Sequence, residues 1–460
     1  MRFTRRLLER RTPTAFFTAS SLAAAAILSC SDDPEEAGVE VDDVDGAADV
    51  MRPVLPDGAD ETDASDAGTK DAEPVDAARL PVVCASQPCA RSLVTTLADE
   101  FPTRTEGYCA LLDDGTVACW GTNKDGQLGR GEDATMTNSA TPARVAGLTN
   151  VAHLDHTCAV KDDGEVWCWG KGPFLRSANE PSVERAAVQV AIPPATKIAM
   201  SMVTACALVA DEVLCWGSNA DGIVAPYGEA GLSENLQPRS MTIAAGAPVR
   251  DLALGRAAFA LREDGTTLSW GANPPLGRVS SLFPDPYPTT APLSGIGAMD
   301  VVVDNVCAVS GGTGYCWGAI VPSPADDPKE LKLDRALPEP VIAPEPLVQI
   351  ATTRSYLTYP FEQPLVEPFR WCAVSSTGSV YCTGLNGSGQ AGDGTKQHAY
   401  EVVKVVGLPG PAAEVRTLPL STCALLTTGD VYCWGNNFDG QLGTGQVKGE
   451  SWTPKRVVLP

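Results

Sequence analysis

The sequence is poor in the side chains that most enzymes use for catalysis. It contains three histidines, and aromatic residues make up 6% of its 460 residues. Histidine is the side chain that most often transfers protons near neutral pH, so few general bases are available. The sequence also has no Ser-His-Asp grouping and no glycine-rich phosphate-binding loop. We therefore expect a protein that is not an enzyme and that has no cofactor and no metal site.

Positive charge is scarce as well. The chain has 34 Lys and Arg against 57 Asp and Glu, which gives a net charge of −23. Binding to nucleic acid depends on Lys and Arg contacts with phosphates, so we exclude nucleic acid as a partner. Residues 31–80 carry 17 acidic and 3 basic groups, hence −14, and nearly lack aromatic residues. This composition is typical of a disordered chain, and we interpret residues 31–80 as an acidic tether.

The sequence has no apolar run long enough to cross a bilayer comfortably. The longest, from Ala15 to Leu28, is short and rich in alanine, which disfavours the alternative of a transmembrane anchor. Several arginines precede it and Cys30 follows it, a pattern typical of a secretory signal. The end of the run resembles a lipobox, with Leu28 atypical for its place. We therefore expect residues 1–30 to be a lipoprotein signal peptide ending at a lipidated Cys30. Ser31 favours the outer membrane.

What the chain does have is a repeat. Seven copies contain an apolar stretch, a turn that has a glycine in six of them, and then Cys-Trp-Gly or a variant of it. Successive copies are 48 to 53 residues apart, apart from one interval of 65. A period near 50 indicates a blade-type or solenoid repeat, in which each unit packs against its neighbours. The copies begin at Cys109, Cys158, Cys206, Phe259, Cys307, Cys372 and Cys423.

Turn lengths predict how the two cysteines of each copy face each other. If Asp113-Asp114-Gly115 is a three-residue loop with left-handed Gly115, Leu112 faces Thr116 and Cys109 faces Cys119. Two copies have their cysteines one residue closer and a turn one residue shorter, which preserves the opposition. Opposed residues of a non-hydrogen-bonded pair lie close enough for a disulfide. The predicted pairs are Cys109–Cys119, Cys158–Cys168, Cys206–Cys215, Cys307–Cys316, Cys372–Cys382 and Cys423–Cys433.

The remaining cysteines fit the same interpretation. The fourth copy has Phe259 and Ser269 in place of both cysteines, so the pair is lost as a unit. Cys84 and Cys89 make a plausible seventh pair, and Cys30 is left over for lipidation. Zinc is the alternative, but structural zinc sites prefer ligands two to four residues apart, and disulfides suit an exported protein.

Strand alternation places apolar residues on both faces of each hairpin. Cys109 and Leu111 share one face, and Ala110, Leu112 and Trp120 share the other. Both faces should therefore be buried between neighbouring units, and seven such units suggest a closed ring. We interpret the recurring tryptophans as packing residues and expect Trp452, which lies outside their register, to be exposed.

The repeats resemble the regulator of chromosome condensation repeat. The similarity is clearest in residues 119–129, 155–170 and 433–443, and a strand containing proline follows in residues 141–145 and 453–457. It implies an all-β fold, a seven-bladed β-propeller of four-stranded antiparallel blades, over residues 81–460. The family includes a nucleotide-exchange factor for a nuclear GTPase and secreted bacterial proteins, so the fold alone does not assign a function.

Three other patterns were weighed as sites. His156 occupies the repeat's own histidine position, where we expect a structural hydrogen bond; a metal site with His153 lacks a matching carboxylate, and His398 has no evident partner. Residues 123–132 resemble part of a calcium loop, but turn chemistry explains them.

The function that the sequence favours is a lipid-anchored scaffold at the bacterial cell envelope. We expect a monomeric propeller head that binds a protein or glycan partner through its loops. One alternative is a hydrolase or lyase with carboxylates in a central funnel, which a cluster of carboxylates with raised pKa values in one pocket would favour. Another is an exchange factor, which would require a cytoplasmic location.

Overall fold

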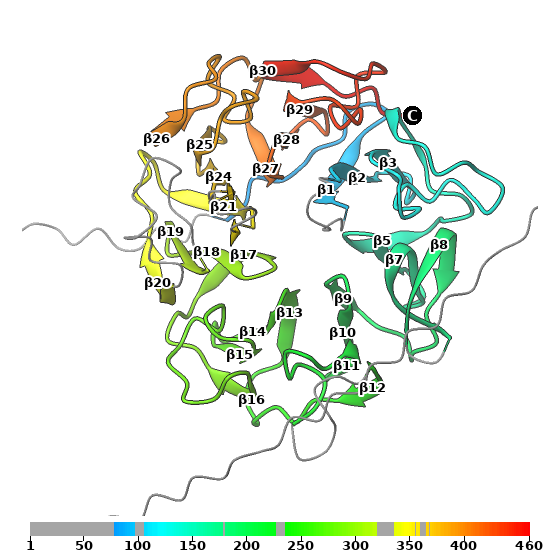
Figure 1. Ribbon diagram of the computed structural model, residues 1–460, viewed down its shortest axis with the longest axis vertical. Coiled ribbons are helices and arrows are strands. Elements are labelled where there is room, and N and C mark those ends of the chain that lie inside the picture. Colours follow the sequence, from blue (N-terminus) through cyan, green and yellow to red (C-terminus); the bar gives the residue numbers. More distant parts are fainter. Residues whose placement is uncertain are drawn as a thin grey trace, which may run out of the picture. The chain divides into compact units, whose positions relative to one another are not determined.

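The computed structural model describes residues 78–96, 105–177, 180–226, 235–319, 335–354, 356–358, 365–367 and 369–460. The expected signal peptide, Cys30 and all but the last three residues of the expected tether lie outside these ranges. Within the described residues the secondary structure consists of strands and turns (Figure 1). None of these residues belongs to a helix long and apolar enough to cross a membrane.

Seven four-stranded antiparallel sheets form the blades of a ring, as the repeats predicted (Figure 1). In each blade the first strand lies nearest the centre and the fourth at the rim. The first three blades consist of β1 (Ala90–Thr95), β2 (Gly107–Leu112), β3 (Val117–Gly121) and β4 (Ser139–Arg144); β5 (Val151–Asp155), β6 (Cys158–Lys161), β7 (Val166–Ser177) and β8 (Glu180–Gln189); and β9 (Lys197–Met200), β10 (Thr204–Val209), β11 (Glu212–Ser218) and β12 (Asn235–Ser240).

The other four blades follow the same order. They consist of β13 (Val249–Leu254), β14 (Ala257–Arg262), β15 (Thr267–Gly271) and β16 (Asp285–Thr290); β17 (Ile296–Val302), β18 (Asn305–Ser310), β19 (Thr313–Gly318) and β20 (Arg335–Pro340); β21 (Leu347–Thr352), β24 (Trp371–Ser375), β25 (Val380–Gly384) and β26 (Ala399–Lys404); and β27 (Ala412–Thr417), β28 (Ser421–Leu426), β29 (Val431–Asn436) and β30 (Glu450–Arg456). A small hairpin of β22 (Tyr356–Thr358) and β23 (Leu365–Glu367) is inserted between β21 and β24.

The hairpin register is the one that the turn lengths predict. The Leu112 N–H donates to the Thr116 carbonyl at 2.8 Å, and Gly115 adopts a φ of 75°. Cys109 lies opposite Cys119 with their Cα atoms 4.1 Å apart, a spacing typical of a non-hydrogen-bonded pair. In the two shorter copies, two-residue turns keep Cys206 opposite Cys215 and Cys307 opposite Cys316. All seven cysteine pairs, Cys84–Cys89 included, are placed compatibly with disulfide bonds.

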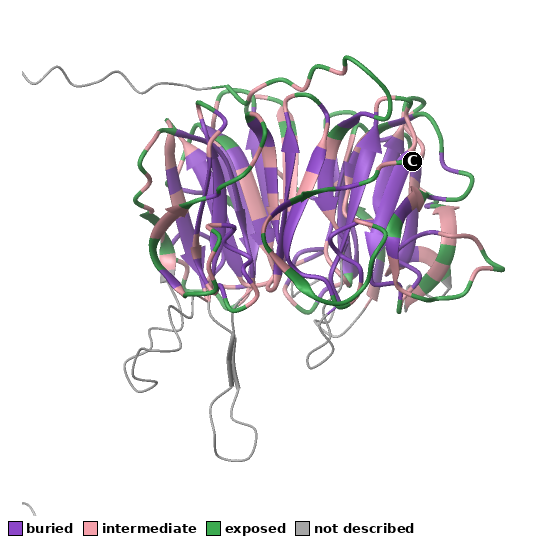
Figure 2. Ribbon diagram, turned by 90° about the horizontal axis from the view of Figure 1, so that it is seen from above, coloured by how far each residue is buried: buried purple, intermediate pink, exposed green. Residues whose placement is uncertain are grey.

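Neighbouring blades pack cysteine against tryptophan. Cys109 and Cys119 lie in one apolar cluster with Trp169 of the next blade, while Ala110 and Trp120 lie in another with the preceding blade. Both hairpin faces are therefore buried, as strand alternation predicts, and Figure 2 shows buried residues filling the strands. Each recurring tryptophan donates its indole N–H to a backbone carbonyl of the preceding blade at 2.7 to 2.9 Å, the acceptors being Gln441, Gln127, Pro173, Ile223, Pro275 and Gln390.

The fourth blade replaces its missing cysteines with other contacts. Phe259 meets Trp317 of the next blade edge to face, with ring centroids 6.1 Å apart. Opposite Phe259, the Ser269 hydroxyl accepts a hydrogen bond from Arg278, whose guanidinium pairs with the buried Asp285 at 2.8 Å. An aromatic contact and a buried ion pair thus occupy the place that a cysteine pair has in the other blades.

The ring closes by contact between the last blade and the first, since no blade includes a strand from both ends of the described chain. Trp120 packs against Cys423 and Cys433 of the seventh blade, as tryptophans do elsewhere in the ring. The leader, which we define as residues 78–89, runs alongside the seventh blade toward β1 (Figure 1). The Val83 N–H donates to Thr427, and the Ala90 N–H donates to Gly429. Side-chain packing and the leader together join the two ends of the ring.

Candidate binding site at the centre of the ring

The innermost strands are tied to one another by side chains. The first strand of a blade has an edge that no other strand covers, so its N–H and C=O groups need other partners. Asp155 accepts the Met200 N–H of the next blade at 2.9 Å, and Asp300 accepts the Thr352 N–H at 2.7 Å. Other side chains that bridge consecutive blades in this way are Gln349, which bonds to Val415, and Glu414, which accepts from Leu93.

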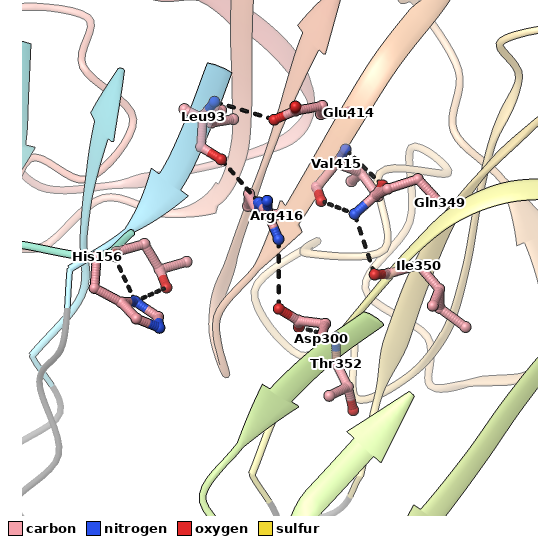
Figure 3. A network of polar contacts seen from close by, with 10 residues as sticks. Leu93, His156, Asp300, Gln349, Ile350, Thr352, Glu414, Val415 and Arg416 are labelled. Carbon is pink, nitrogen blue, oxygen red and sulfur yellow. Dashed lines mark hydrogen bonds and ion pairs between the residues drawn. The ribbon is translucent and has the colours of Figure 1, made fainter. Parts of the chain in front are cut away.

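One ion pair joins two blades that are not neighbours. Arg416 of the seventh blade donates from Nε to the Leu93 carbonyl at 2.8 Å and from Nη1 to Asp300 of the fifth blade at 3.4 Å (Figure 3). The two side chains are 20% and 18% exposed, so both remain open to solvent. Burial raises the pKa of the Asp300 carboxyl, while Arg416 and the Thr352 N–H act in the opposite direction.

His156 stands in the turn between β5 and β6 and makes the structural hydrogen bond expected of it. Its backbone is left-handed, with a φ of 49°, and its Nδ1 lies 2.9 Å from the Thr95 carbonyl of the first blade (Figure 3). A carbonyl oxygen can only accept, so Nδ1 carries the proton in the neutral ring. Nε2 is then left as a hydrogen-bond acceptor.

These residues belong to a central pocket of about 440 Å³. Its walls come from all seven blades, and its mouth is formed by the turns between first and second strands; we call this side of the ring the 1–2 face. Most of the surface is apolar, while Asp300 and Arg416 lie deeper, within the strands. Apolar wall residues are Met202, Val203, Leu254, Val301, Val302, Val303, Leu418 and Pro419.

Val303 is held in an unfavourable backbone conformation at this mouth. Its φ is 55°, in the left-handed region that β-branched residues avoid. A residue there costs about 1–2 kcal/mol relative to the right-handed region. Such strain is often found at functional sites, and here it occurs in a residue that lines the pocket.

Glu106 is a second carboxyl of the pocket with a raised pKa, again because of burial. Its Oε1 accepts the Leu420 N–H at 2.6 Å, and its Oε2 accepts the Ser421 hydroxyl at 2.6 Å. The side of the pocket near Glu106 is thus already hydrogen-bonded to the seventh blade. Asp300 is the more accessible of these two carboxyls, so a ligand can reach it, whereas Glu106 serves the blade interface.

Beside the pocket lies Arg370, which sequence reasoning missed. It is fully buried and donates to the carbonyls of Leu418 and Gln390 at 2.6 and 2.7 Å. It also donates to the hydroxyls of Thr417 and Thr422. Burial lowers its pKa to about 10. Arg370 joins the sixth and seventh blades and positions the Thr417–Leu418 wall of the pocket.

The other predicted sites do not join this pocket. His153 lies 3.3 Å from the Ile198 carbonyl, and among the described residues no group of three metal-ligating side chains could hold an ion. The Asn123 amide oxygen accepts the Leu128 N–H, which confirms the turn interpretation of the calcium-like loop. His398, for which the sequence suggested no partner, packs on Tyr400 with ring centroids 4.4 Å apart. Trp452 is 43% exposed at the rim, as expected.

The fold and the pocket define a seven-bladed β-propeller with a binding pocket on its axis. Two family models described as the regulator of chromosome condensation (RCC1) repeat match the chain, one over residues 154–174 and 421–441 and the other over residues 114–160. These segments of the chain therefore match the RCC1 repeat, which supports the resemblance that the sequence motifs suggested.

Solved structures support the same fold. Yeast RCC1 (Prp20) bound to Kap60 is 18% identical, with 74% of this chain and 83% of that chain covered and a TM-score of 0.59. Prp20p from Saccharomyces cerevisiae, described with its binding to Gsp1p and histones, is 18% identical over 79% and 87% of the two chains, with a TM-score of 0.58. Human WBSCR16 is 18% identical over 75% and 94%, with a TM-score of 0.56.

Proposed function

We propose that this protein is an exported, lipid-anchored scaffold whose propeller head binds a protein partner through the 1–2 face. The N-terminal signal pattern, Cys30 and the acidic tether support an envelope location, most simply the outer membrane. The propeller fold shared with yeast Prp20, together with the protein partners of Prp20, supports a protein rather than a glycan as the partner.

The observation that carries this proposal is the central pocket. The repeated residues of the blades are used for packing, whereas the residues at the mouth differ from copy to copy. At the position of Glu106 the other blades have Asp155, Val203, Arg256, Asp304, Phe369 and Leu420. A surface assembled from unlike residues on a rigid ring suits selective recognition of one partner.

Two matched variants test which face binds. Val203 is 40% exposed at the pocket mouth, and Val83 is 66% exposed in the leader, near the turns between second and third strands. Val203→Glu and Val83→Glu make the same chemical change at the two places. We expect envelope proteins crosslinked to the full-length chain to be lost with V203E and retained with V83E. Equal retention by both variants would contradict binding at the 1–2 face. Crosslinks to glycan alone would show that the partner is a glycan and not a protein.

Anchoring is tested separately. Mass spectrometry of the purified chain should find acyl groups on Cys30 as the new N-terminus, and Cys30→Ala should release the protein from membranes. An unmodified chain in the cytoplasm would overturn the envelope location and would favour the exchange-factor alternative.

Hydrolysis remains a second candidate because Asp300 and Glu106 both line the pocket and both have raised pKa values. Their existing hydrogen bonds account for both side chains without a reaction. Screening the chain and its Asp300→Asn variant against ester, peptide and glycoside substrates decides the point, since turnover that D300N abolishes would establish an enzyme.

A further inference from the structure

The central pocket combines an apolar wall with charged side chains, among which Asp300 and Arg416 pair with each other within the strands. Valines and leucines from several blades form the wall, and the Asp300–Arg416 pair lies at the deep end. Apolar walls with a few polar groups are typical of pockets that orient a ligand by its polar end. The nature of the deep end therefore limits the class of ligand.

A ligand with a single charge does not suit this deep end. An ammonium group near Asp300 would be repelled by Arg416, and a carboxylate near Arg416 would be repelled by Asp300, since the two side chains are 3.4 Å apart. At the mouth, His156 adds an acceptor, because its Nδ1 proton is directed to Thr95. A head group that both donates and accepts hydrogen bonds satisfies Asp300 and Arg416 without bringing in an unpaired charge.

We infer that the pocket binds an apolar side chain of an extended peptide, and that the neighbouring amide of the peptide hydrogen-bonds to the Asp300–Arg416 pair. The amide N–H donates to the Asp300 carboxylate, and the amide C=O accepts from the Arg416 guanidinium. The side chain lies against the valine-rich wall formed by Val203, Leu254 and residues 301–303. This inference rests on the proposed function, since the peptide is a segment of the protein partner.

The geometry of the pair favours recognition over a purely structural role. Asp300 already accepts a hydrogen bond from the Thr352 N–H at Oδ2, and Arg416 already donates one from Nε to the Leu93 carbonyl. These bonds fix both side chains in place, while each keeps about a fifth of its surface exposed. A fixed, partly exposed donor and acceptor side by side bind an amide with little loss of side-chain freedom.

Four compounds with the same branched body and different heads test this class. They are N-acetyl-L-leucinamide, L-leucine, 4-methylpentanoate and isopentylamine, titrated calorimetrically into the full chain in detergent, with V203E as the pocket-blocked control. We expect N-acetyl-L-leucinamide to bind about tenfold more tightly than either singly charged compound, the difference that one hydrogen bond to a charged group produces. N-acetylglycinamide, which lacks the body, should bind far more weakly.

Charge variants give a second readout. Asp300→Asn should move the preference toward 4-methylpentanoate, and Arg416→Gln should move it toward isopentylamine, each by about tenfold. Thermal melts show whether each charge variant is folded. Where a charge variant does not fold, the comparison of the native chain with V203E, which leaves the deep end intact, still tests the inference. Equal affinity for all four heads, or saturable binding of none, would overturn the inference.

Two outcomes separate the possible sources of the ligand. Tightest binding of L-leucine would show that the pocket is for a free amino acid and would overturn the peptide. If no compound binds but the protein partner is still captured in a manner sensitive to V203E, this inference fails while the proposed function stands.

Discussion

Trp371 lies directly opposite Thr383 across the β24–β25 hairpin. Thr383 stands where other blades have their recurring tryptophan, and Trp371 supplies an indole from the facing strand. It packs in one cluster with Cys307 and Cys316 of the preceding blade, as the tryptophans of other blades do with their own neighbours. The sixth blade thus keeps the contact while exchanging the strand that makes it.

This exchange predicts a compensating pair of substitutions. Trp371→Thr should destabilise the propeller by about 3–5 kcal/mol, because it leaves a cavity between the fifth and sixth blades. Adding Thr383→Trp should recover much of that loss by restoring the indole at the usual position. Chemical denaturation of both variants measures the free energies, and a double variant no more stable than W371T would show that the two positions are not interchangeable.

Each paired cysteine should be oxidised within its own blade. Non-reducing peptide mapping is expected to find Cys109–Cys119 and the corresponding pairs, and removing one pair by Cys→Ala changes should cost about 2–3 kcal/mol on the chain-entropy account. Free thiols or links between blades would contradict the pairing. As a control, Phe259→Cys with Ser269→Cys should form a new link without a gain in stability, since Phe259 then no longer packs on Trp317.

Two buried or anchored carboxyls should give opposite pH dependence. Burial raises the pKa of Glu106, so its favourable contribution is present at acid pH and is lost as the pH rises through the folded-state pKa. Hydrogen bonds from Ser375, Thr377 and Tyr381 lower the pKa of Glu345 to about 2, so its contribution is lost as the pH falls toward that value. The Tm of Glu106→Gln, taken relative to that of the native chain, should rise from acid to neutral pH. The relative Tm of Glu345→Gln should fall over the same range. Parallel trends in thermal melts across that range would contradict the assignment.

Arg370 should be sensitive even to a conservative change. It donates to five oxygen acceptors from a fully buried position, and lysine has neither the planar head nor the number of donors to replace it. Arg370→Ala and Arg370→Lys should both destabilise by about 3–5 kcal/mol, the range found when one partner of a buried charged network is removed. Arg456→Lys, whose side chain is 65% exposed, is the control and should be close to neutral, because exposed ion pairs contribute little.

The repeat made the blades predictable, because the alternation, turn lengths and cysteine positions are all local to one copy. The pocket was not predictable in this way. Asp300 and Arg416 are 116 residues apart in the sequence and belong to different blades. Glu106 and Arg370 each depend on partners in another blade. Nothing in a single copy predicts such contacts, because the repeat specifies only how a blade folds. Contacts between residues of different blades depend on how the blades are arranged in the ring. The one available signal was disagreement between copies at the turn positions.

The position of the leader determines where a pulling force on the N-terminal side of the propeller would act. Residues 78–89 run onto the seam between the seventh and first blades and are held there by the backbone bonds of Val83 and Ala90. A pull on the chain ahead of Arg79 is transmitted first to these two bonds and then to the joint between the ends of the ring. The six other joints lie away from this attachment, so we expect the head to begin to open at the seam under tension.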